Sequence, residues 1–449
     1  MSNLGRYRCL ISEIGGRVAR AALVLAIALA VAAPGQEVVL QPGHLCAAVV
    51  ERVCTHGFLK ELNAPGGSMP RAGLVYDANT GNLYGTTTFG GKDSSGVIYK
   101  IDSSGKFGRV AQFKRNSPTG RFLGIHPNAL TVDKMGNLYG TTVDGGPTGL
   151  GVIFMYSPTT NTYMATALGF LGTDGTNPIA GVVLNQQTNT LYGTTLRGGV
   201  SNNGTVFALD NTFVNLTYPY QFTGGADGGA PAASVILDKE GNIYGTTMNG
   251  GMTGGNCGNT GCGVVFKIDL KRKIQMVLHR FTGGVDGGFP MASLLIDSVG
   301  NLYGTAMMGG KTGGACGTLG CGVVFMIDKN KKHTVLYSFG GRDGKYPRAE
   351  LTFGPKNSVY GTTERGGRFG KGTVFKLDLS IADLSTTNPV VHDFTGGKDG
   401  KLPLAGLLLH KGRLYGTASA GGNVHVGPFY HCCRGTAYAI RNPSKSVDQ

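Results

Sequence analysis

Short apolar stretches alternate with glycine-rich turns along most of this chain, in a pattern that recurs seven times. Each repeat has four segments in which apolar and polar residues alternate with a period of two, as they do in strands with one buried face. The clearest copy predicts strands over residues 290–297, 301–305, 322–328 and 334–339. Turn-forming residues separate these segments, with a Gly-Gly pair between the second and the third. The pattern therefore predicts a series of small four-stranded sheets.

One element, Tyr-Gly-Thr-Thr or Tyr-Gly-Thr-Ala, marks every repeat. It begins at seven tyrosines spaced 52 to 59 residues apart: Tyr84, Tyr139, Tyr192, Tyr244, Tyr303, Tyr360 and Tyr415. This period indicates an array of one supersecondary unit that is too small to bury its own core. Four strands per repeat, seven times over, predict an all-β fold: a seven-bladed β-propeller of four-stranded antiparallel blades. A linear β-solenoid is the alternative, although its coils are usually shorter and more uniform.

The ends of the array predict how the ring closes. The seventh repeat has a third strand at residues 435–440 but no convincing fourth strand after it. The N-terminal segment offers a candidate, because His56 stands two residues before a phenylalanine, as His279 and His392 do in the fourth strands of two repeats. We therefore expect residues 47–58 to form the outer strand of the last blade.

Within each repeat, the residue types have local physical reasons. Asp-x-x-Gly-Asn and the Asp-Gly pairs between repeats place turn formers where the chain reverses. The glycine inside Tyr-Gly-Thr leaves a strand without a side chain, which usually indicates close approach of a neighbouring backbone. A proline opens most first strands, where a missing hydrogen-bond donor costs least.

The repeat also resembles a known family. Its consensus combines Phe-x-Gly-Gly-x-Asp-Gly-x-x-Pro-x-Ala-x-Leu, Gly-Asn-Leu-Tyr-Gly-Thr-Thr and Gly-x-Val-Phe-Lys-Ile-Asp. These motifs, over residues 58–441, resemble the tandem repeat of the GloVer family, named after Gloeobacter and Verrucomicrobia. The resemblance implies an exported repeat protein of undetermined function. Family members often carry a C-terminal sorting anchor, whereas residues 442–449 contain no apolar tail.

The N-terminus has the pattern of an export signal. Four arginines precede the apolar run at residues 21–33, which is too short to span a bilayer comfortably and ends in small residues. We expect cleavage after Ala32 or Ala33, which leaves no membrane span in a secreted, periplasmic or cell-surface protein; an uncleaved anchor is the alternative. The expected boundaries are a signal peptide at 1–32, a linker at 33–46, the propeller at 47–441 with repeats beginning near 70, 127, 178, 231, 290, 347 and 403, and a tail at 442–449.

The charge balance is basic. The formal charge of +15 falls to +12 when residues 1–32, with four Arg and one Glu, are removed. A basic surface can attract acidic polysaccharide, lipid headgroups or nucleic acid. The Lys and Arg residues are scattered, with short clusters at 271–273 and 329–332, so we interpret them as a solvated face. Export disfavours nucleic acid, and the expected partner of this monomeric propeller is a carbohydrate or another cell-envelope component.

Eight of the nine cysteines lie outside the signal segment, an even number that suits an oxidising compartment. Two pairs occupy the same loop of the fourth and fifth repeats, and we expect each to form a local disulfide: Cys257 with Cys262 and Cys316 with Cys321. A four-thiolate metal site shared by the two loops is the alternative. Four more cysteines are expected to form disulfides of undetermined connectivity: Cys46, Cys54, Cys432 and Cys433. A bond from Cys46 or Cys54 to Cys432 or Cys433 would close the ring, and a bond between Cys46 and Cys54 is the alternative.

Three other residue types recur at fixed positions, and each has a structural interpretation that outweighs the chemical one. Five aspartates in the linkers between repeats favour Asp-Gly turns over Ca²⁺ ligation: Asp174, Asp227, Asp286, Asp343 and Asp399. The repeat tyrosines favour packing over a sugar-stacking ring. His279 and His392 take positions that hold Tyr220 and Tyr337 in two other repeats, which favours half-buried packing over metal binding. His425 and His431, beside the last cysteines, are weaker metal candidates.

No catalytic constellation is recognisable. The chain lacks a nucleophile elbow, a P-loop, a dinucleotide-binding fingerprint and a His-Glu-x-x-His motif. We therefore expect no cofactor, and we predict a noncatalytic exported scaffold that binds carbohydrate or an envelope component. The alternative is a propeller enzyme, a glycan lyase or hydrolase or a lactonase, with its site in the central channel. The channel-facing strands look nearly uniform, which favours binding, and function is expected in irregular loops such as 114–126 and 423–434.

Overall fold

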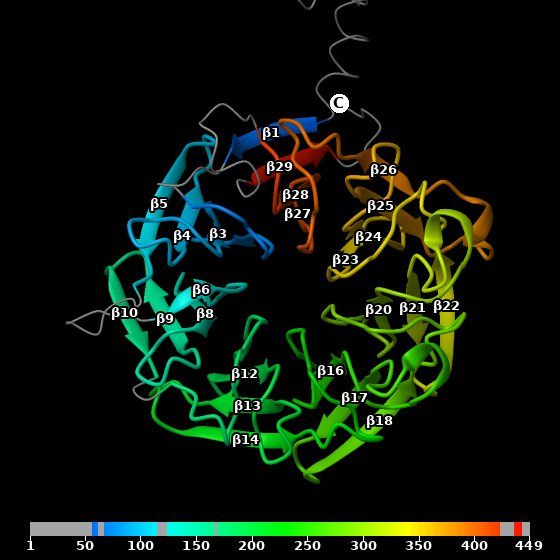
Figure 1. Cartoon of the computed structure of the whole chain (residues 1–449). Helices are drawn as coiled ribbons and strands as arrows, with labels where there is room; N and C mark the ends of the chain where they lie inside the picture. Colours follow the sequence, from blue (N-terminus) through cyan, green and yellow to red (C-terminus); the bar gives the residue numbers. More distant parts are fainter. Residues whose placement is uncertain (1–55, 62–66, 115–123, 167–168, 423–434, 442–449) are drawn as a thin grey trace, which may run out of the picture. The chain divides into compact units, whose positions relative to one another are not determined.

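Seven antiparallel sheets stand around a central axis as the blades of a propeller (Figure 1). The computed structural model describes residues 56–61, 67–114, 124–166, 169–422 and 435–441. For the strand at 56–61 it describes the backbone only. These residues belong to one compact unit that starts at His56. The all-β class and the seven-bladed architecture predicted from the repeat are confirmed.

Blades 1 to 4 follow one another along the chain. Blade 1 consists of β2 (Val75–Tyr76), β3 (Leu83–Thr87), β4 (Val97–Ile101) and β5 (Phe107–Gln112). Blade 2 consists of β7 (Thr131–Val132), β8 (Leu138–Asp144), β9 (Ile153–Ser157) and β10 (Thr162–Ala165), with β6 (Ile125–Pro127) beside β8. Blade 3 consists of β11 (Val183–Asn185), β12 (Thr190–Thr195), β13 (Thr205–Leu209) and β14 (Leu216–Gln221). Blade 4 consists of β15 (Ile236–Leu237), β16 (Ile243–Thr247), β17 (Val264–Asp269) and β18 (Ile274–Arg280).

Blades 5 to 7 complete the ring. Blade 5 consists of β19 (Leu295–Ile296), β20 (Leu302–Ala306), β21 (Val323–Ile327) and β22 (His333–Ser338). Blade 6 consists of β23 (Thr352–Gly354), β24 (Ser358–Thr363), β25 (Thr373–Asp378) and β26 (Val390–Asp393). Blade 7 consists of β27 (Leu408–His410), β28 (Arg413–Ala418), β29 (Thr436–Arg441) and β1 (His56–Glu61). Short 3₁₀ helices lie in connecting segments: η2 (Gly255–Cys257), η3 (Gly314–Cys316) and η4 (Leu384–Thr386).

The innermost strands are shorter than the sequence pattern predicted. In blade 5 the expected strand at 290–297 is reduced to β19, two residues long. Phe289, just before the proline, has a left-handed backbone (φ 56°), and its N–H donates to the carbonyl oxygen of Cys262 in blade 4. The Pro-x-Ala segment thus makes contacts between blades instead of extending the ladder of its own sheet. A left-handed residue precedes the proline in all seven repeats: Met69, His126, Asn177, Ala230, Phe289, Tyr346 and Leu402.

The first threonine of every Tyr-Gly-Thr element joins its blade to the next one. Its hydroxyl donates a hydrogen bond to a main-chain carbonyl in the Pro-x-Ala segment of the following blade, as Thr246 does to Ala292 at 3.1 Å. These hydroxyls are buried, so the bond also satisfies a polar group that water does not reach. The donors are Thr86, Thr141, Thr194, Thr246, Thr305, Thr362 and Thr417.

The glycine before that threonine makes room for an aromatic ring. Gly245 on β16 lies opposite Phe266 on β17, and a Cβ at Gly245 would come within 2.6 Å of the Phe266 ring. The same close contact occurs in all seven blades. The expectation that a neighbouring backbone approaches this glycine is therefore wrong, because the closest atoms belong to an aromatic side chain on the adjacent strand.

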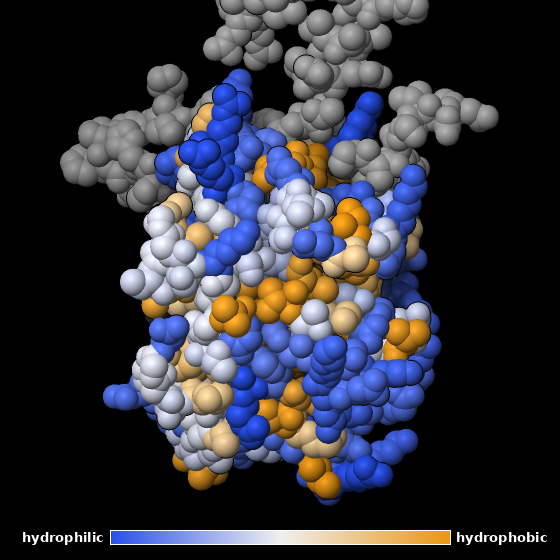
Figure 2. All heavy atoms as spheres, turned by 90° about the vertical axis from the view of Figure 1, so that its right-hand side faces the viewer, coloured by the Kyte–Doolittle hydropathy of each residue, from blue (hydrophilic) through white to orange (hydrophobic). Residues whose placement is uncertain are grey.

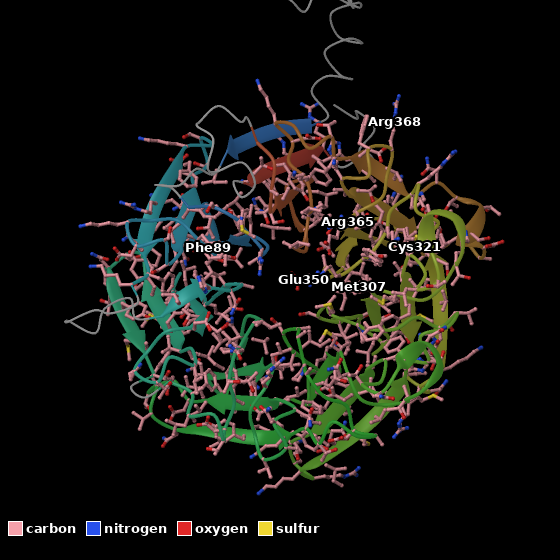
Figure 3. The ribbon with its side chains drawn as sticks, in the orientation of Figure 1. Phe89, Met307, Cys321, Glu350, Arg365 and Arg368 are labelled. Carbon is pink, nitrogen blue, oxygen red and sulfur yellow. A yellow bond between two sulfur atoms is a disulfide. The ribbon has the colours of Figure 1, made fainter. Side chains whose placement is uncertain are left out.

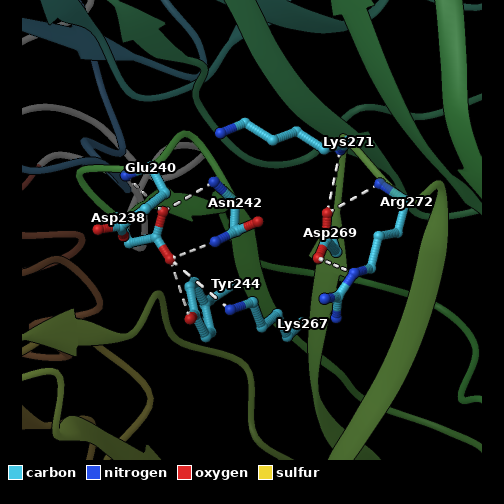
Figure 4. Close-up of polar contacts among 8 residues, drawn as sticks. All are labelled: Asp238, Glu240, Asn242, Tyr244, Lys267, Asp269, Lys271 and Arg272. Atoms are coloured by element: carbon cyan, nitrogen blue, oxygen red, sulfur yellow. Dashed lines mark hydrogen bonds and ion pairs between the residues drawn. The ribbon is translucent and has the colours of Figure 1, made fainter.

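The Asp-x-x-Gly-Asn turn holds the repeat tyrosine in place. In blade 4, the Oδ1 atom of Asp238 accepts hydrogen bonds from the N–H groups of Glu240 and Asn242 (Figure 4). Its Oδ2 atom accepts from the Asn242 side chain at 2.7 Å and from the Tyr244 hydroxyl at 3.1 Å. Lys267 lies 3.8 Å from the same oxygen. One carboxylate thus closes the turn and anchors the tyrosine of the next strand.

The last blade contains strands from both ends of the array. β1 pairs antiparallel with β29, with His56 opposite Ile440. Of the predicted strand at 47–58, only 56–58 lie in β1, which continues to Glu61; residues 47–55 lie outside the described part. Near the axis, Thr417 of blade 7 donates to the carbonyl oxygen of Ala72 in blade 1 at 2.9 Å. Blades 7 and 1 are therefore joined by the same contact as every other pair of neighbours.

The hydrophobic core lies between the sheets. One cluster, for example, combines Val265 and Phe281 of blade 4 with Leu294, Leu302 and Phe325 of blade 5. Figure 2 shows the side of the ring that carries β18 and β22, where hydrophilic residues predominate and hydrophobic ones form small separate patches. Each blade therefore buries its apolar faces against its two neighbours.

Replacement of Thr246 by Val should destabilise the propeller, since the buried Ala292 carbonyl loses its donor. We expect the free energy of unfolding to fall by about 1–3 kcal/mol in urea titrations. Thr246→Ser keeps the hydroxyl and serves as the control. Equal losses in the two variants would contradict a role for the hydrogen bond.

Replacement of Tyr99 by Phe should stabilise the protein. The Tyr99 hydroxyl is buried and has no hydrogen-bond partner among the described residues, and burial raises the pKa of this group. Five other blades carry Phe at this position. We expect the free energy of unfolding to rise by about 1 kcal/mol. The reverse change, Phe154→Tyr in blade 2, should lower it, and a destabilised Tyr99→Phe variant would disprove the explanation.

Candidate functional site

A cavity of about 550 Å³ lies on the propeller axis and is lined by residues of all seven blades. Its wall consists mainly of the Pro-x-Ala-x segments at the start of each innermost strand. Alanine methyl groups recur around this wall, at Ala72, Ala129, Ala180, Ala233, Ala292, Ala349 and Ala405. The volume is in the range of small-ligand sites, about 300–1,000 Å³. The cavity is therefore large enough for a small molecule or for the end of a chain.

The residues on either side of each alanine differ from blade to blade. The residue before it is Arg71, Asn128, Ile179, Ala232, Met291, Arg348 or Leu404. Among the lining residues, the one after it is Gly73, Gly181, Ser234, Ser293, Glu350 or Gly406. The threonine hydrogen bonds hold the backbone of these segments in equivalent positions, while the flanking side chains are free to vary. The cavity wall thus loses the sevenfold repetition of the scaffold.

Glu350 lies near the centre of the ring, beside the axis (Figure 3). Its side chain crosses toward two blades that carry glycine at the equivalent position. A Cβ at Gly406 would lie 2.1 Å from the Cγ atom of Glu350, and a Cβ at Gly73 would lie 3.8 Å from its Oε1 atom. Any side chain at 406 would therefore displace Glu350, so the two glycines make the space in which this carboxyl group sits.

The Glu350 carboxyl group has no hydrogen-bond or ion-pair partner within the described part of the chain. Its side chain is exposed to water in the cavity, and the surrounding blades partly desolvate the carboxyl group. This desolvation raises the pKa of Glu350 above its ordinary value. A group in this state favours a ligand that donates hydrogen bonds to it or carries a positive charge.

A second group of charges lies at the edge of the cavity, in blade 6. Arg348 donates to Glu364 at 3.0 Å, and Arg365 lies 3.5 Å from the other carboxylate oxygen of Glu364. Arg348 remains 31% exposed in this pair. Arg71 of blade 1, also in the cavity wall, is exposed. The cavity therefore presents donors from arginine beside an acceptor from Glu350.

The sequence had suggested nearly uniform channel-facing strands, and the lining of this cavity differs from that expectation. Glu350 and Glu364 each occur in one blade at the positions they occupy, and arginine stands before the alanine in two blades, as Arg71 and Arg348. The second strand of each blade, which carries the repeat tyrosine, is nearly uniform. The axis, however, is lined by the segment before the first strand. The signal that could have revealed the site is the variation on both sides of the alanine in Pro-x-Ala-x.

The predicted local disulfides are present. Cys257 is bonded to Cys262 and Cys316 to Cys321, each pair with Cα atoms 4.8 Å apart, so these thiols are not zinc ligands. Disulfides of this kind are typical of proteins exported to an oxidising compartment. The other predicted disulfide residues lie outside the described part: Cys46, Cys54, Cys432 and Cys433. So do His425, His431 and most of the two loops at 114–126 and 423–434.

The linker aspartates accept hydrogen bonds around their own turns. Asp286 accepts from the N–H and the hydroxyl of Thr282 and from Nε2 of His279 at 3.2 Å. Asp399 makes the same contacts with Thr395 and His392. Burial alone raises the pKa of both carboxyl groups, but the hydrogen bonds from His and Thr outweigh it and hold each pKa below its ordinary value. These groups therefore have the turn role that the sequence favoured.

His279 also takes part in ring stacking. Its ring lies 3.9 Å from that of His333 on the neighbouring blade, and it meets Phe281 edge-on. Burial, together with the nearby His279, lowers the pKa of His333 to about 4. The repeat tyrosines likewise pack between strands, with Tyr84, Tyr192, Tyr303 and Tyr360 buried. Packing therefore accounts for these aromatic positions, as the sequence indicated.

The described residues contain neither a metal-binding cluster nor a membrane-spanning helix. They contain no group of three or more His, Cys, Asp or Glu side chains that could hold a metal ion. Within the same ranges, none of the helices is long and apolar enough to cross a membrane.

Comparison with protein families gives one match that covers most of the chain. The model of the Gloeobacter/Verrucomicrobia repeat matches residues 50–256 and 252–430. The chain belongs to this family. The two matches together include all seven Tyr-Gly-Thr elements, in agreement with the resemblance seen in the consensus. Comparison with curated protein sequences gives no match.

Two solved structures with a similar fold belong to longer chains. Both are extracellular domains of putative hybrid two-component systems of B. thetaiotaomicron, BT3049 and BT4673. They are 12% and 13% identical to this chain, and each aligns with a TM-score of 0.51. The alignments cover 83% and 88% of this chain but 40% and 43% of those domains. The chain thus spans about two fifths of their length, and at this identity the likeness concerns the propeller fold alone.

Replacement of Asp286 by Asn should show how the linker turns depend on pH. We expect a loss of about 1–3 kcal/mol in the free energy of unfolding at pH 7. Because the pKa of Asp286 is lowered in the folded protein, its contribution is present above the unfolded pKa, about 3.9, and is lost as pH falls through the folded value.

The difference between wild type and Asp286→Asn should therefore shrink below pH 4 in denaturant titrations. Asp102→Asn is the control, since that aspartate lies in an exposed turn and its loss should matter less. A constant difference from pH 7 to pH 3 would rule out the charged Asp286 as the source of the stabilisation.

Proposed function

We propose that this protein is an exported propeller that binds carbohydrate, or another hydroxyl-rich component of the cell envelope, in the axial cavity. The observation that carries the proposal is Glu350, an unpaired carboxyl group in a space kept open by Gly73 and Gly406. A purely structural role would leave this carboxyl group hydrogen-bonded within the protein, as those of Asp286 and Asp399 are. A ligand with hydroxyl donors would satisfy it.

The composition of the cavity suits a sugar. A carboxylate accepts hydrogen bonds from neighbouring hydroxyl groups, and Arg71 and Arg348 offer N–H donors to ring or hydroxyl oxygens. Ser234 and Ser293 add groups that both donate and accept. The alanine methyl groups supply the small apolar surface on which the C–H faces of a sugar can rest. Few convergent polar groups in an otherwise apolar cavity are typical of ligand sites.

Export supports this assignment. The signal-like segment at residues 1–32 and the two disulfides fit a mature chain in the periplasm, at the cell surface or in the medium. Polysaccharides and other envelope components are abundant there.

The test is binding of the mature chain to a glycan array, followed by calorimetry with the glycans that bind. Glu350→Gln should weaken binding by about tenfold or more, which corresponds to 1.4 kcal/mol. Glu240→Gln removes an equal charge from an exposed turn and should bind as wild type does. Absence of binding to every glycan, or equal affinities of the wild type and Glu350→Gln, would refute the carbohydrate assignment.

A second candidate is an enzyme of glycan or lactone cleavage. The observation that favours it is the place of Glu350 in the axial cavity, between Gly73 and Gly406 and without a partner among the described residues, where desolvation raises its pKa; carboxyl groups in such positions can act as general acid or base. Incubation with glycans and lactones distinguishes the two functions. Turnover that disappears in Glu350→Gln while binding persists would favour the enzyme, and binding without turnover would favour the scaffold.

A further inference from the structure

A concentration of positive charge lies beside the axial cavity, although its residues are dispersed in the sequence. Three segments contribute to it: the linker before blade 6 (340–345), the loop between β24 and β25 (364–372) and the linker before blade 7 (396–401). They contain seven Lys or Arg residues, which we call the basic sector: Arg342, Lys345, Arg365, Arg368, Lys371, Lys398 and Lys401.

Backbone contacts bring the three segments together. The N–H of Gly367 donates to the carbonyl oxygen of Gly341 at 3.0 Å, and Lys345 forms a β-bridge with Arg365. The N–H of Leu402 donates to the carbonyl oxygen of Lys371 at 3.0 Å. The loop 364–372 therefore lies between the two linkers and contacts both.

The basic sector extends outward from the axial cavity. In Figure 3, Glu350, Arg365 and Arg368 lie at increasing distance from the axis. Five members are exposed, and two, Lys345 and Lys401, are half-buried. The stem of Lys371 lies along the second linker, because a Cβ at Gly396 would be 3.5 Å from its Cγ atom. The positive charges thus form a strip rather than a ring around the cavity.

The acidic residues of these segments are already engaged. Glu364 pairs with Arg348 and Arg365. Asp343 accepts hydrogen bonds from Tyr337 and Gly340, and Asp399 accepts them from Thr395 and His392. Asp393, at the end of β26, also accepts the N–H of Arg368 at 2.7 Å. Four carboxylates therefore stand against the seven cations, and each of the four already accepts hydrogen bonds or an ion pair from the scaffold.

Equivalent segments around another blade lack the positive charge of the basic sector. The equivalent segments around blade 4, residues 224–229, 248–263 and 283–288, contain no Lys or Arg. Where blades 6 and 7 carry Arg342 and Lys398, the linkers before blades 3, 4 and 5 carry Thr173, Ala226 and Val285. The scaffold consequently does not require positive charge at these positions.

We propose that the basic sector binds an acidic polysaccharide, a glycan chain that carries carboxylate or sulfate groups and whose end occupies the axial cavity. This inference rests on the proposed carbohydrate function and specifies its substrate class. A strip of Arg and Lys matches a linear chain with repeated anions, and guanidinium groups pair with carboxylate and sulfate in two-point contacts. The strip starts at the cavity whose Glu350 and Arg348 would hold an uncharged part of the sugar.

The test uses polygalacturonate as the probe and its methyl ester, which has the same backbone without charge, as the matched ligand. The variant Arg342→Thr/Lys345→Thr/Lys398→Ala/Lys401→Gly replaces each residue by the one found at the equivalent position of blade 3 or 4. The control variant changes four exposed turn lysines to Gln: Lys134, Lys239, Lys271 and Lys329. Both variants lose four positive charges, so a difference between them reports where the charge is removed and not how much.

We expect polygalacturonate to bind the wild type and the control variant with similar affinity, and the sector variant at least about tenfold more weakly. Binding should weaken as salt is added, and the methyl ester should show little dependence on the sector. Equal losses in the two variants would overturn the inference, because binding would then follow net charge alone. Tighter binding of a DNA duplex or of phosphatidylglycerol vesicles, with the same dependence on the sector, would also overturn it.

The two proposals fail in different ways. If neutral glycans bind in a Glu350-dependent manner but the sector variant binds polygalacturonate as wild type does, the basic sector is not part of the site and the axial function stands. If polygalacturonate binding depends on the sector but not on Glu350, the acidic-glycan surface stands and the axial cavity is not its terminus. Calorimetry with Glu350→Gln and the sector variant separates these cases.

Discussion

A buried hydrogen bond from threonine to a main-chain carbonyl joins each blade of this propeller to the next. A single four-stranded blade cannot bury both of its apolar faces, so it is stable only between two neighbours. The threonine bond fixes the spacing of neighbouring blades near the axis, where the innermost strands are too short to do so through their own ladders. The bond from Thr417 to Ala72 extends this connection across the two ends of the array. Sheet packing, cavity and loop positions all depend on this ring of contacts.

The same contacts explain why the conspicuous motif carries no chemistry. In Tyr-Gly-Thr, the tyrosine hydroxyl binds the turn aspartate in several blades, the glycine accommodates a ring of the next strand, and the threonine holds the following blade. All three residues are therefore engaged in contacts that hold the fold together. Side chains free to act on a ligand lie elsewhere, on either side of the alanine in Pro-x-Ala-x and in the loops between blades. Glu350 and the residues around Arg365 occupy such positions.

Much of the fold was predictable because it follows from local rules. The period of two, the turn residues and the 52–59 residue repeat predicted the number and kind of blades, and the short spacing of Cys257 and Cys262 predicted their disulfide. The length of the first strands was not predictable, since the residue before the proline donates its N–H to the preceding blade, as seen in blades 2, 4, 5, 6 and 7. Glu350 was missed for a related reason: nothing in its own segment shows that it faces the axis.

The sequence by itself determined the repeating unit and its turns, because each depends on groups close together in the chain or on a pattern that recurs. Only the tertiary structure decided what meets at the axis and at the mouth of the cavity. Thr417 and Ala72 are 345 residues apart, and Glu350 lies against Gly406 and near Gly73 in different blades. The lysines and arginines of the basic sector looked scattered for the same reason. Their proximity results from the closure of the ring, which no local pattern encodes.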